Sequence, residues 1–421
     1  MKTLFKRLAA AVIAALTLIS LFGCLKGGGS VPAGSGENTD VFTPSPAVPG
    51  ALAAPTDGNV TDFALKLFRA SAGDGENALL SPLSVLYALA MTANGAKGQT
   101  LSEMENVLGM EIDKLNTYLG ERMKTLPRGD KYKLDAANSI WFKEDENFSV
   151  KEDFLKVNED HYAAEVRSAP FDDGTLNDIN NWVKEKTDGM IEKMLDKIDP
   201  NSVMFLINAL AFDAEWEEKY VDGDVRESIF ILEDGTYKKA TFMYSVEGEY
   251  LEDEKAEGFI KYYAGRKYAF VGLLPKDGVK LADYVASLDG NKLNEMLSNP
   301  SHEKVKVSVP KFETEYDAEL SRVLARMGMP TAFDGDHADF SGIGTYRDGN
   351  LYIGAVLHKT FISVDEKGTK AGAATVVDTM TFTSIQPEMK RVYLNRPFVY
   401  MLIDCENNLP FFIGTMYDVE K

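Results

Sequence analysis

A few side chains in this sequence could take part in catalysis or metal binding, but their spacing does not support either chemistry. Ser301 and Lys304 satisfy an S-x-x-K pattern, which marks a serine acyl-enzyme site when both residues lie one turn apart on a helix. Here the pair follows an Asn-Pro dipeptide and leads into a strand-like segment. The chain has only two cysteines, and its four histidines lack HExxH or paired spacing: His161, His302, His337 and His358. The sequence therefore indicates no catalytic residue, no metal site and no cofactor.

The segment from Thr369 to Thr381 has the side-chain pattern of a β-strand. Every odd position is uncharged and small or β-branched, and both charges, Lys370 and Asp378, fall on even positions. Since side chains on a strand alternate between faces, this segment could lie in a sheet with one face buried and its charges in water. It is also rich in Ala, Gly and Thr, a composition typical of a mobile loop. A loop that can become a strand indicates a conformational device rather than a fixed active site.

The elements that would position this loop show both helical and strand periodicity. Residues 60–68 and 320–327 have apolar side chains at helical spacing. Val203 to Ala211, Tyr268 to Leu274 and Phe398 to Ile403 are nearly continuous apolar runs, which favours buried central strands. The expected class is therefore a large α+β fold.

The N-terminus has the pattern of an export signal. Lys2, Lys6 and Arg7 precede an apolar run from Leu8 to Phe22, so we expect residues 1–23 to be removed and to lie outside the fold. The end of this run, Leu21-Phe22-Gly23-Cys24, resembles the bacterial lipoprotein box, in which cleavage frees a cysteine whose sulfur receives lipid. This resemblance implies lipidation at Cys24 and a membrane anchor through the N-terminal lipid. The alternative is an ordinary secretory signal with an incidental cysteine.

The remaining chain divides into a linker and one large domain. Residues 24–56 are rich in Gly, Ser and Pro with few large apolar side chains, so they predict a flexible tether. Residues 57–421 contain no comparable break and predict a single domain.

Removal of the signal, with its three positive charges, takes the formal net charge from −20 to −23, which argues against nucleic-acid binding. With Cys24 lipidated, Cys405 has no disulfide partner.

Beyond these patterns, the chain from Asn59 to its end resembles the serpin family of serine protease inhibitors. The order of several sequence blocks and the segment from Glu366 to Thr375 carry the resemblance. The blocks are Asn77 to Ser84, Asn138 to Phe142, Ile179 to Val183 with Thr187, Gly189 and Ile191, Asn208 to Phe212 with Trp216, Val309 to Phe312, Ala338 to Gly342, and Asn395 to Phe398 with Gly414.

The resemblance implies three β-sheets, about nine helices and an exposed reactive loop near the C-terminus. It also implies the activity: a target serine protease forms an acyl bond at the loop, and the cleaved loop then inserts as a new strand into the large sheet. The protease stays trapped in a covalent 1:1 acyl complex. The implied molecule is a metastable, extracytoplasmic, single-use inhibitor, and we expect it to be a monomer that is either lipid-anchored or secreted.

The family pattern assigns roles to individual positions. The hinge through which the loop would enter the sheet comprises Glu366, Gly368, Thr369, Ala371, Gly372, Ala373, Ala374 and Thr375, and its small inward residues are those of inhibitory members. The usual spacing of sixteen residues from Glu366 places the reactive bond at Phe382-Thr383, with Met380 and Gln386 as alternatives. Ser81, Ser84, Asn208 and His358 match the shutter positions beneath the large sheet, and residues 354–364 would be the strand that leads to the hinge.

Phenylalanine before the reactive bond would suit a chymotrypsin-like or subtilisin-like protease with an apolar primary pocket. Two other classes remain open. A non-inhibitory serpin acting as a binding module would need an unfavourable hinge, whereas an extracytoplasmic hydrolase or solute-binding lipoprotein would need a catalytic or ligand constellation.

Overall fold

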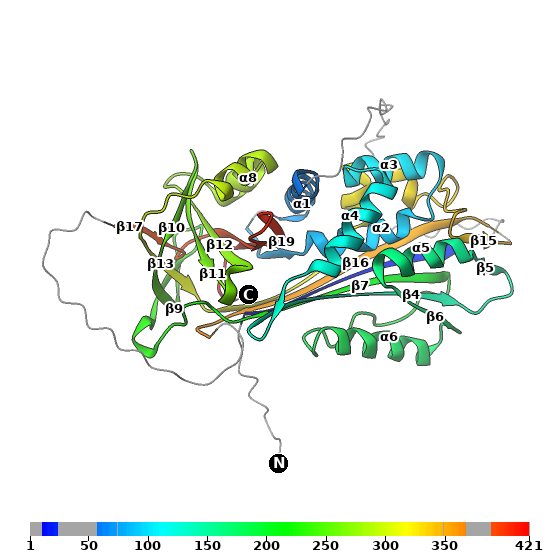
Figure 1. Cartoon of the computed structure of the whole chain (residues 1–421), viewed down its shortest axis with the longest axis horizontal. Helices are drawn as coiled ribbons and strands as arrows, with labels where there is room; N and C mark the ends of the chain where they lie inside the picture. The colour runs from blue at the N-terminus through cyan, green and yellow to red at the C-terminus, as the bar shows by residue number, and fades with distance from the viewer. Residues whose placement is uncertain (1–10, 24–56, 74, 348, 368–388, 421) are drawn as a thin grey trace, which may run out of the picture.

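This computed structural model describes residues 11–23, 57–73, 75–347, 349–367 and 389–420. Within these ranges the chain forms nine α-helices, three large β-sheets and a two-stranded ribbon (Figure 1). The predicted α+β class with three principal sheets is therefore confirmed.

The largest sheet has seven strands and runs along most of the molecule. Its order is β14-β16-β1-β7-β4-β3, and β6 pairs with β4. The bounds are β14 (Phe312–Glu319), β16 (Leu351–Val364), β1 (Ala11–Gly23), β7 (Ser202–Ala214), β4 (Tyr132–Lys143), β3 (Arg128–Gly129) and β6 (Glu165–Ala169). Strand β7 is buried along almost its whole length, as its continuous apolar run predicts.

Two further sheets form the other half of the molecule. The six-stranded sheet has the order β10 (Glu249–Glu252), β11 (Ala256–Tyr262), β12 (Tyr268–Pro275), β18 (Phe398–Asp404), β19 (Leu409–Met416) and β2 (Ala78–Leu80). The four-stranded sheet has the order β17 (Lys390–Tyr393), β13 (Val305–Pro310), β9 (Tyr237–Glu247) and β8 (Val225–Ile231). The ribbon pairs β15 (Gly344–Tyr346) with β5 (Phe148–Val150).

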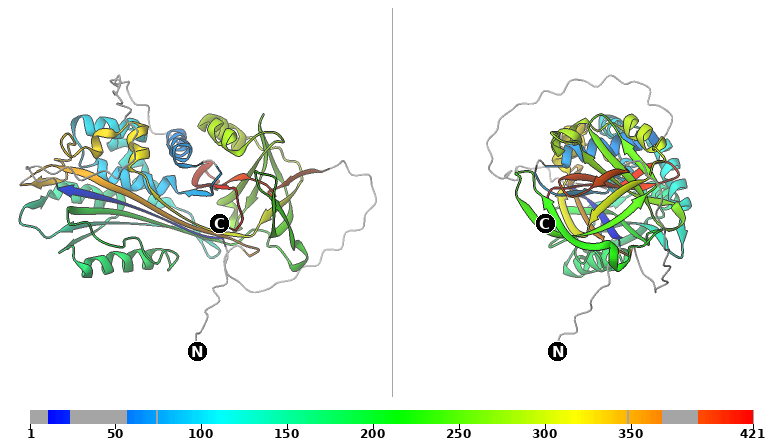
Figure 2. Two further views of the ribbon diagram at one scale, coloured as in Figure 1. Left: turned by 180° about the vertical axis from the view of Figure 1, so that it is seen from behind. Right: turned by 90° about the vertical axis from the view of Figure 1, so that its left-hand side faces the viewer.

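Helices cover both faces of the large sheet. Helix α6 lies against one face, and the group α2 to α5 lies over the other (Figure 1, Figure 2). The α-helical bounds are α1 (Asp57–Ser71), α2 (Pro82–Ala93), α3 (Gly98–Leu108), α4 (Ile112–Thr125), α5 (Glu152–Tyr162), α6 (Asp173–Lys186), α7 (Leu281–Ser287), α8 (Gly290–Ser298) and α9 (Ser321–Met327). Single 3₁₀ turns occur at η1 (Asp222–Asp224), η2 (Ala264–Arg266) and η3 (Pro330–Phe333). No helix in the described ranges is both long and apolar enough to span a bilayer.

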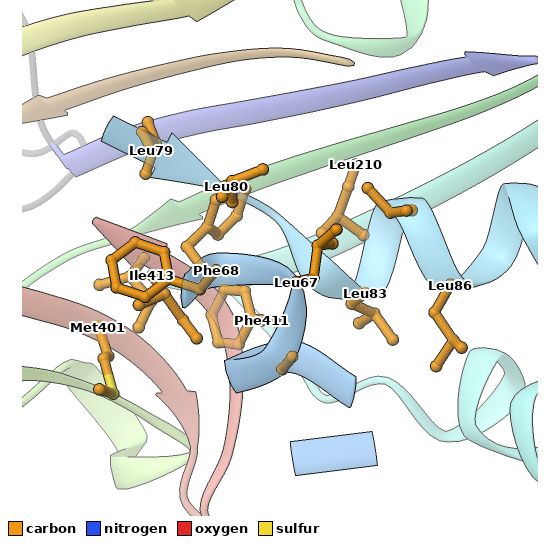
Figure 3. Close-up of a cluster of buried hydrophobic side chains, with 14 of the residues drawn as sticks. Leu67, Phe68, Leu79, Leu80, Leu83, Leu86, Leu210, Met401, Phe411 and Ile413 are labelled. Carbon is orange, nitrogen blue, oxygen red and sulfur yellow. The ribbon is translucent and has the colours of Figure 1, made fainter. Parts of the chain in front are cut away.

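The main core joins the large sheet to the six-stranded sheet. Leucine and phenylalanine side chains from α1, α2, β2, β7 and β19 meet there without exposure to solvent (Figure 3). They include Leu67, Phe68, Leu80, Leu86, Leu210 and Phe411. Helix α2 begins with Ser81 as its N-cap, whose hydroxyl accepts the Ser84 N–H, and Pro82 occupies the first turn.

The structure of the full chain differs from the expectation for the N-terminus. Residues 1–23 were expected to lie outside the fold, but residues 11–23 form β1, an inner strand of the large sheet. The physical reason is that an export signal and a strand buried on both faces require the same composition, an uncharged apolar run. Removal of residues 1–23 as a signal stays a prediction.

Candidate functional site

The candidate site is the position between β7 and β16 in the large sheet, here called the slot. Strand β1 fills the slot with thirteen residues and runs antiparallel to both neighbours. Val12 pairs with Ser363 near the end of β16, and Gly23 pairs with Leu351 at its start. Strand β1 therefore begins beside the residues that lead to the hinge and runs away from them (Figure 1).

Residues 16–21 of the occupying strand are buried on both faces. Leu16 and Leu18 lie in a cluster with Ile179 and Trp182 of α6, whereas Ile19 and Leu21 lie in the main core. All four leucine and isoleucine side chains have zero exposure. A strand in the slot is thus sandwiched between α6 and the core rather than attached to a surface.

The middle of the slot contains a polar cluster built from two strands, β1 and β16, and the start of α2. The Ser81 N–H donates to His358 Nε2 at 3.1 Å, so the ring proton resides on Nδ1. This Nδ1 lies 2.8 Å from Thr17 Oγ1, and the same hydroxyl lies 3.0 Å from Ser84 Oγ. Burial lowers the pKa of His358 to about 3, which keeps the imidazole neutral. Ser81, Ser84 and His358, three of the four predicted shutter residues, therefore meet around Thr17.

The fourth shutter residue, Asn208, belongs to a neighbouring network on β7. It pairs with Thr17 on one side and Asn138 on the other. Its Nδ2 donates to Asn138 Oδ1 at 2.9 Å, and Asn138 Nδ2 donates to the Tyr162 carbonyl at 2.8 Å. The sequence prediction did not include Thr17, because its segment was assigned to the export signal, or Asn138, whose block was noted without a role.

The hinge end of the slot is held by charged and aromatic groups. Trp216 Nε1 donates to the Asp365 carbonyl at 2.8 Å, and Lys311 Nζ lies 2.5 Å from the Glu366 carboxylate. Burial would raise the pKa of Glu366, but the Lys311 ammonium outweighs it and the net pKa falls. Burial raises the pKa of Asp365 to about 6. The residue before the hinge therefore carries a carboxyl group that ionises around pH 6 instead of near pH 3.8.

A buried ammonium group supports the same end. The Lys261 side chain is 2% exposed, and its Nζ lies 2.8 Å from Glu247 Oε1. It also lies 4.4 Å from the ring centre of Tyr220 and 5.3 Å from that of Trp216. Burial would lower the pKa of Lys261, but Tyr220 and Glu247 outweigh it and raise the pKa. This ammonium orders the rings that contact the base of the hinge.

The far end of the slot is closed by rings packed on glycine. Phe22 and Tyr352 meet edge to face with centroids 5.7 Å apart. A Cβ atom placed on Gly354 would lie 2.3 Å from the Phe22 ring, and one on Gly23 would lie 2.7 Å from the Tyr346 ring. Only glycine at these positions allows the close approach.

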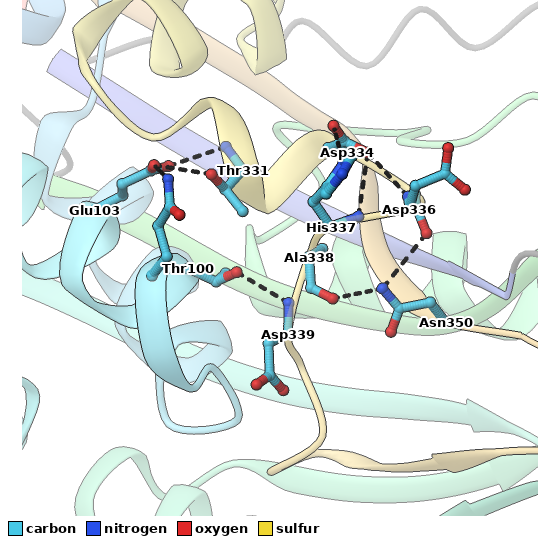
Figure 4. A network of polar contacts seen from close by, with 11 residues as sticks. Thr100, Glu103, Thr331, Asp334, Asp336, His337, Ala338, Asp339 and Asn350 are labelled. Carbon is cyan, nitrogen blue, oxygen red and sulfur yellow. Dashed lines mark hydrogen bonds and ion pairs between the residues drawn. The ribbon is translucent and has the colours of Figure 1, made fainter. Parts of the chain in front are cut away.

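A polar network fixes the start of β16 beside this end. The Glu103 carboxylate accepts the N–H and hydroxyl of Thr331 at 2.9 and 2.8 Å (Figure 4). The Asp339 N–H donates to Thr100 Oγ1 at 2.9 Å, and Asn350, one residue before β16, donates to the Ala338 carbonyl (Figure 4). The far end is therefore rigidly tied to α3 and η3.

Comparison with known proteins identifies the fold family. Residues 58–419 match the family model described as serpin (serine protease inhibitor). This chain belongs to the serpin family. A serpin-like protein of Thermococcus kodakarensis is 32% identical over 85% of this chain and 84% of its own length. Leukocyte elastase inhibitor of Equus caballus is 30% identical over 81% of this chain and 93% of its own length. The native-state crystal structure of the thermophilic serpin tengpin is 49% identical and has a TM-score of 0.81, covering 86% of this chain and 94% of its own.

Serpins are generally protease inhibitors rather than enzymes, and some members are non-inhibitory. In this serpin the segment that connects β16 of the large sheet to β17 of the four-stranded sheet lies mostly outside the described residues. Several predicted positions fall outside them. These are Cys24, Gly368, Thr369, Ala371, Gly372, Ala373, Ala374, Thr375, Phe382 and Thr383, together with the alternatives Met380 and Gln386. Glu366 is the one predicted hinge residue in the described part, and its backbone carbonyl accepts the Tyr220 N–H at 3.2 Å.

Proposed function

We propose that this serpin, once residues 1–23 have been removed, is an irreversible inhibitor of a chymotrypsin-like or subtilisin-like serine protease. One observation supports the proposal most strongly. The slot accepts a complete strand of thirteen residues that starts beside the hinge, and residues 369–381 have the same length. A cleaved loop that folds back from Val364 would enter at the same end and run in the same direction as β1.

The proposed reaction begins as ordinary proteolysis. The serine oxygen of the protease bonds to the carbonyl carbon of Phe382, and the Thr383 amine leaves with a proton supplied by the protease. The freed loop then inserts with its odd positions facing the core, since those side chains are small or β-branched and uncharged. Thirteen residues at ~3.3 Å each would carry the acylated protease about 40 Å. Distortion of the protease during this movement would stop hydrolysis of the acyl bond.

The gain in free energy comes from the slot itself. A strand there forms backbone hydrogen bonds with both β7 and β16 and buries side chains on both faces, as β1 does. The native molecule with an empty slot would therefore be metastable. The name of the equine relative, leukocyte elastase inhibitor, supports protease inhibition by this chain as well. We further propose that the molecule is exported as a monomer and anchored through lipid on Cys24.

The test uses protein recovered after export, with its N-terminus determined by intact mass. Incubation with chymotrypsin should give a covalent adduct that survives denaturing electrophoresis. Mass spectrometry should show that the released C-terminal peptide begins at Thr383. Clean cleavage without an adduct would instead support a substrate-like, non-inhibitory serpin. Absence of cleavage would favour a different class of function.

A pair of hinge variants separates insertion from loop recognition. Ala371→Glu places a charge on an odd, inward position, which should hinder insertion. The ratio of cleaved inhibitor to covalent adduct should therefore rise at least tenfold. Lys370→Glu changes charge at the adjacent even position and should leave this ratio nearly unchanged. Equal effects of both variants would contradict strand insertion.

A further inference from the structure

The N-terminal strand is fitted to the slot at specific positions and does not fill it by apolarity alone. Thr17 is the polar residue that meets His358 and Ser84, where a leucine would leave the imidazole Nδ1–H without an acceptor. Phe22 lies over Gly354, and Gly23 admits the Tyr346 ring. Each of these three contacts depends on the residue type on both sides.

The slot has room for one strand. Strand β1 pairs with β7 over residues 11–22 and with β16 over residues 12–23, so both neighbours use their facing backbone groups on β1. A second strand would find neither partner available. Occupation by residues 11–23 and insertion of the reactive loop are therefore mutually exclusive.

We propose that Ala11–Gly23 is a removable intramolecular plug that keeps the serpin non-inhibitory for as long as it remains attached. This inference rests on the proposed function, because it defines when the loop can insert. In the plugged chain, β1 already forms the strand pairing with β7 and β16 that an inserted loop would form. A cleaved loop would therefore have no slot to enter. The full chain should then behave as a protease substrate.

Removal of the plug would make the serpin inhibitory. A signal peptidase would hydrolyse the Gly23–Cys24 bond, with water supplying the hydroxyl to the Gly23 carbonyl and a proton to the new Cys24 amine. After cleavage the strand is no longer tethered, and its effective concentration at the slot falls to that of a free peptide. Export and activation would thus be the same step.

The first test asks whether the strand is in place in solution. Full chain made by cell-free translation retains residues 1–23, as intact mass would confirm. Amide hydrogen exchange of residues 12–22 should be as slow as that of β7 and β16. Exchange as fast as in a free peptide of the same sequence would overturn the proposal.

The second test asks whether the plug blocks inhibition. Leu18→Asp introduces a carboxylate into the apolar cluster beneath α6 and should release the strand. With chymotrypsin, the full-length Leu18→Asp chain should give at least tenfold more adduct than the full-length wild type. Lys6→Gln alters the same segment outside β1 and should match the wild type. Equal adduct yields from the wild type and Leu18→Asp, with fast exchange in both, would overturn the plug while leaving the proposed inhibition intact.

The two proposals fail differently. If exported, processed protein forms no adduct, the inhibitory function is wrong. Slow exchange of residues 12–22 in the wild type and fast exchange in Leu18→Asp would still support the plug. If Leu18→Asp does not fold, Phe22→Ala provides a milder release, and the exchange measurement on the wild-type chain decides alone.

Discussion

The two ends of the slot are built from different chemistry. At the hinge end, Lys311 pairs with Glu366 and a buried Lys261 pairs with Glu247 beneath the rings of Trp216 and Tyr220. At the far end, aromatic rings pack on glycines without any charge in the contact. An ion pair can form with a different charged side chain, whereas a ring packed on a glycine requires one side chain at one position along the strand. The hinge end is thus suited to admitting a strand, and the far end to fixing its register.

The largest effect should come from the buried ammonium at the hinge end. Lys261→Met leaves the Glu247 carboxylate largely buried without its partner and should lower the free energy of unfolding by about 3–5 kcal/mol. Denaturant unfolding of the full chain measures the loss. Lys261→Met combined with Glu247→Gln should recover part of it, and Lys239→Met at an exposed pair on the same sheet as Glu247 should have no measurable effect. A loss equal in the single and double variants would show that packing, rather than charge, holds this end.

A smaller effect should mark the far end. Gly354→Ala places a methyl group against the Phe22 ring and should destabilise the full chain by about 1–3 kcal/mol. In a Phe22→Ala background the methyl group has room, so the same substitution should cost less than about 0.5 kcal/mol. Thermal unfolding of the four proteins gives the coupling between the two positions. Additive effects would place Phe22 away from Gly354 in solution and would contradict the register of β1.

The smallest effect should be a pH dependence at the hinge end. The pKa of Asp365 is raised from 3.8 to about 6 in the fold, so the stabilisation it provides is complete below about pH 3.8 and is lost as pH rises through about 6. Asp365→Asn keeps an oxygen for the Lys367 N–H but cannot ionise. The melting temperature of the variant should exceed that of the wild type by a few degrees at pH 7, and the two should converge near pH 4.

The pKa of His358 is shifted in the opposite direction. The quantity to follow is therefore the difference in melting temperature between the wild type and Asp365→Asn. The His358 pKa is lowered from 6.5 to about 3, so its stabilisation is present above pH 6.5 and falls as pH drops towards 3. This contribution is common to the wild type and Asp365→Asn and cancels in the comparison. A difference that does not vary with pH would mean that Asp365 is ionised normally.

The resemblance named Ser81, Ser84 and His358 together, and the structure brings these three residues together around Thr17, because the start of α2 lies beside the middle of β16. Ser81 and Ser84 lie at the start of α2, which the sequence did not predict, and His358 lies in the middle of β16, within the segment predicted to be the strand that leads to the hinge. Their role as shutter residues stays a prediction. The long apolar runs also predicted β7, β12 and β18 correctly, since a strand covered on both faces needs no alternation. Lys261 could not be identified as a buried cation, because the groups that compensate its burial come from β9 and the loop after β7.

The sequence by itself determined the fold family and the alternating pattern of residues 369–381 with both charges on even positions, because these depend on residue type and spacing alone. Only the tertiary structure decided where residues 11–23 lie. An apolar run carries the same signature whether it is an export signal or a buried strand, and the outcome depends on whether β7 and β16 offer unpaired backbone beside it. Strands β7 and β16 lie nearly two hundred and more than three hundred residues away along the chain, so no local sequence pattern could reveal this pairing.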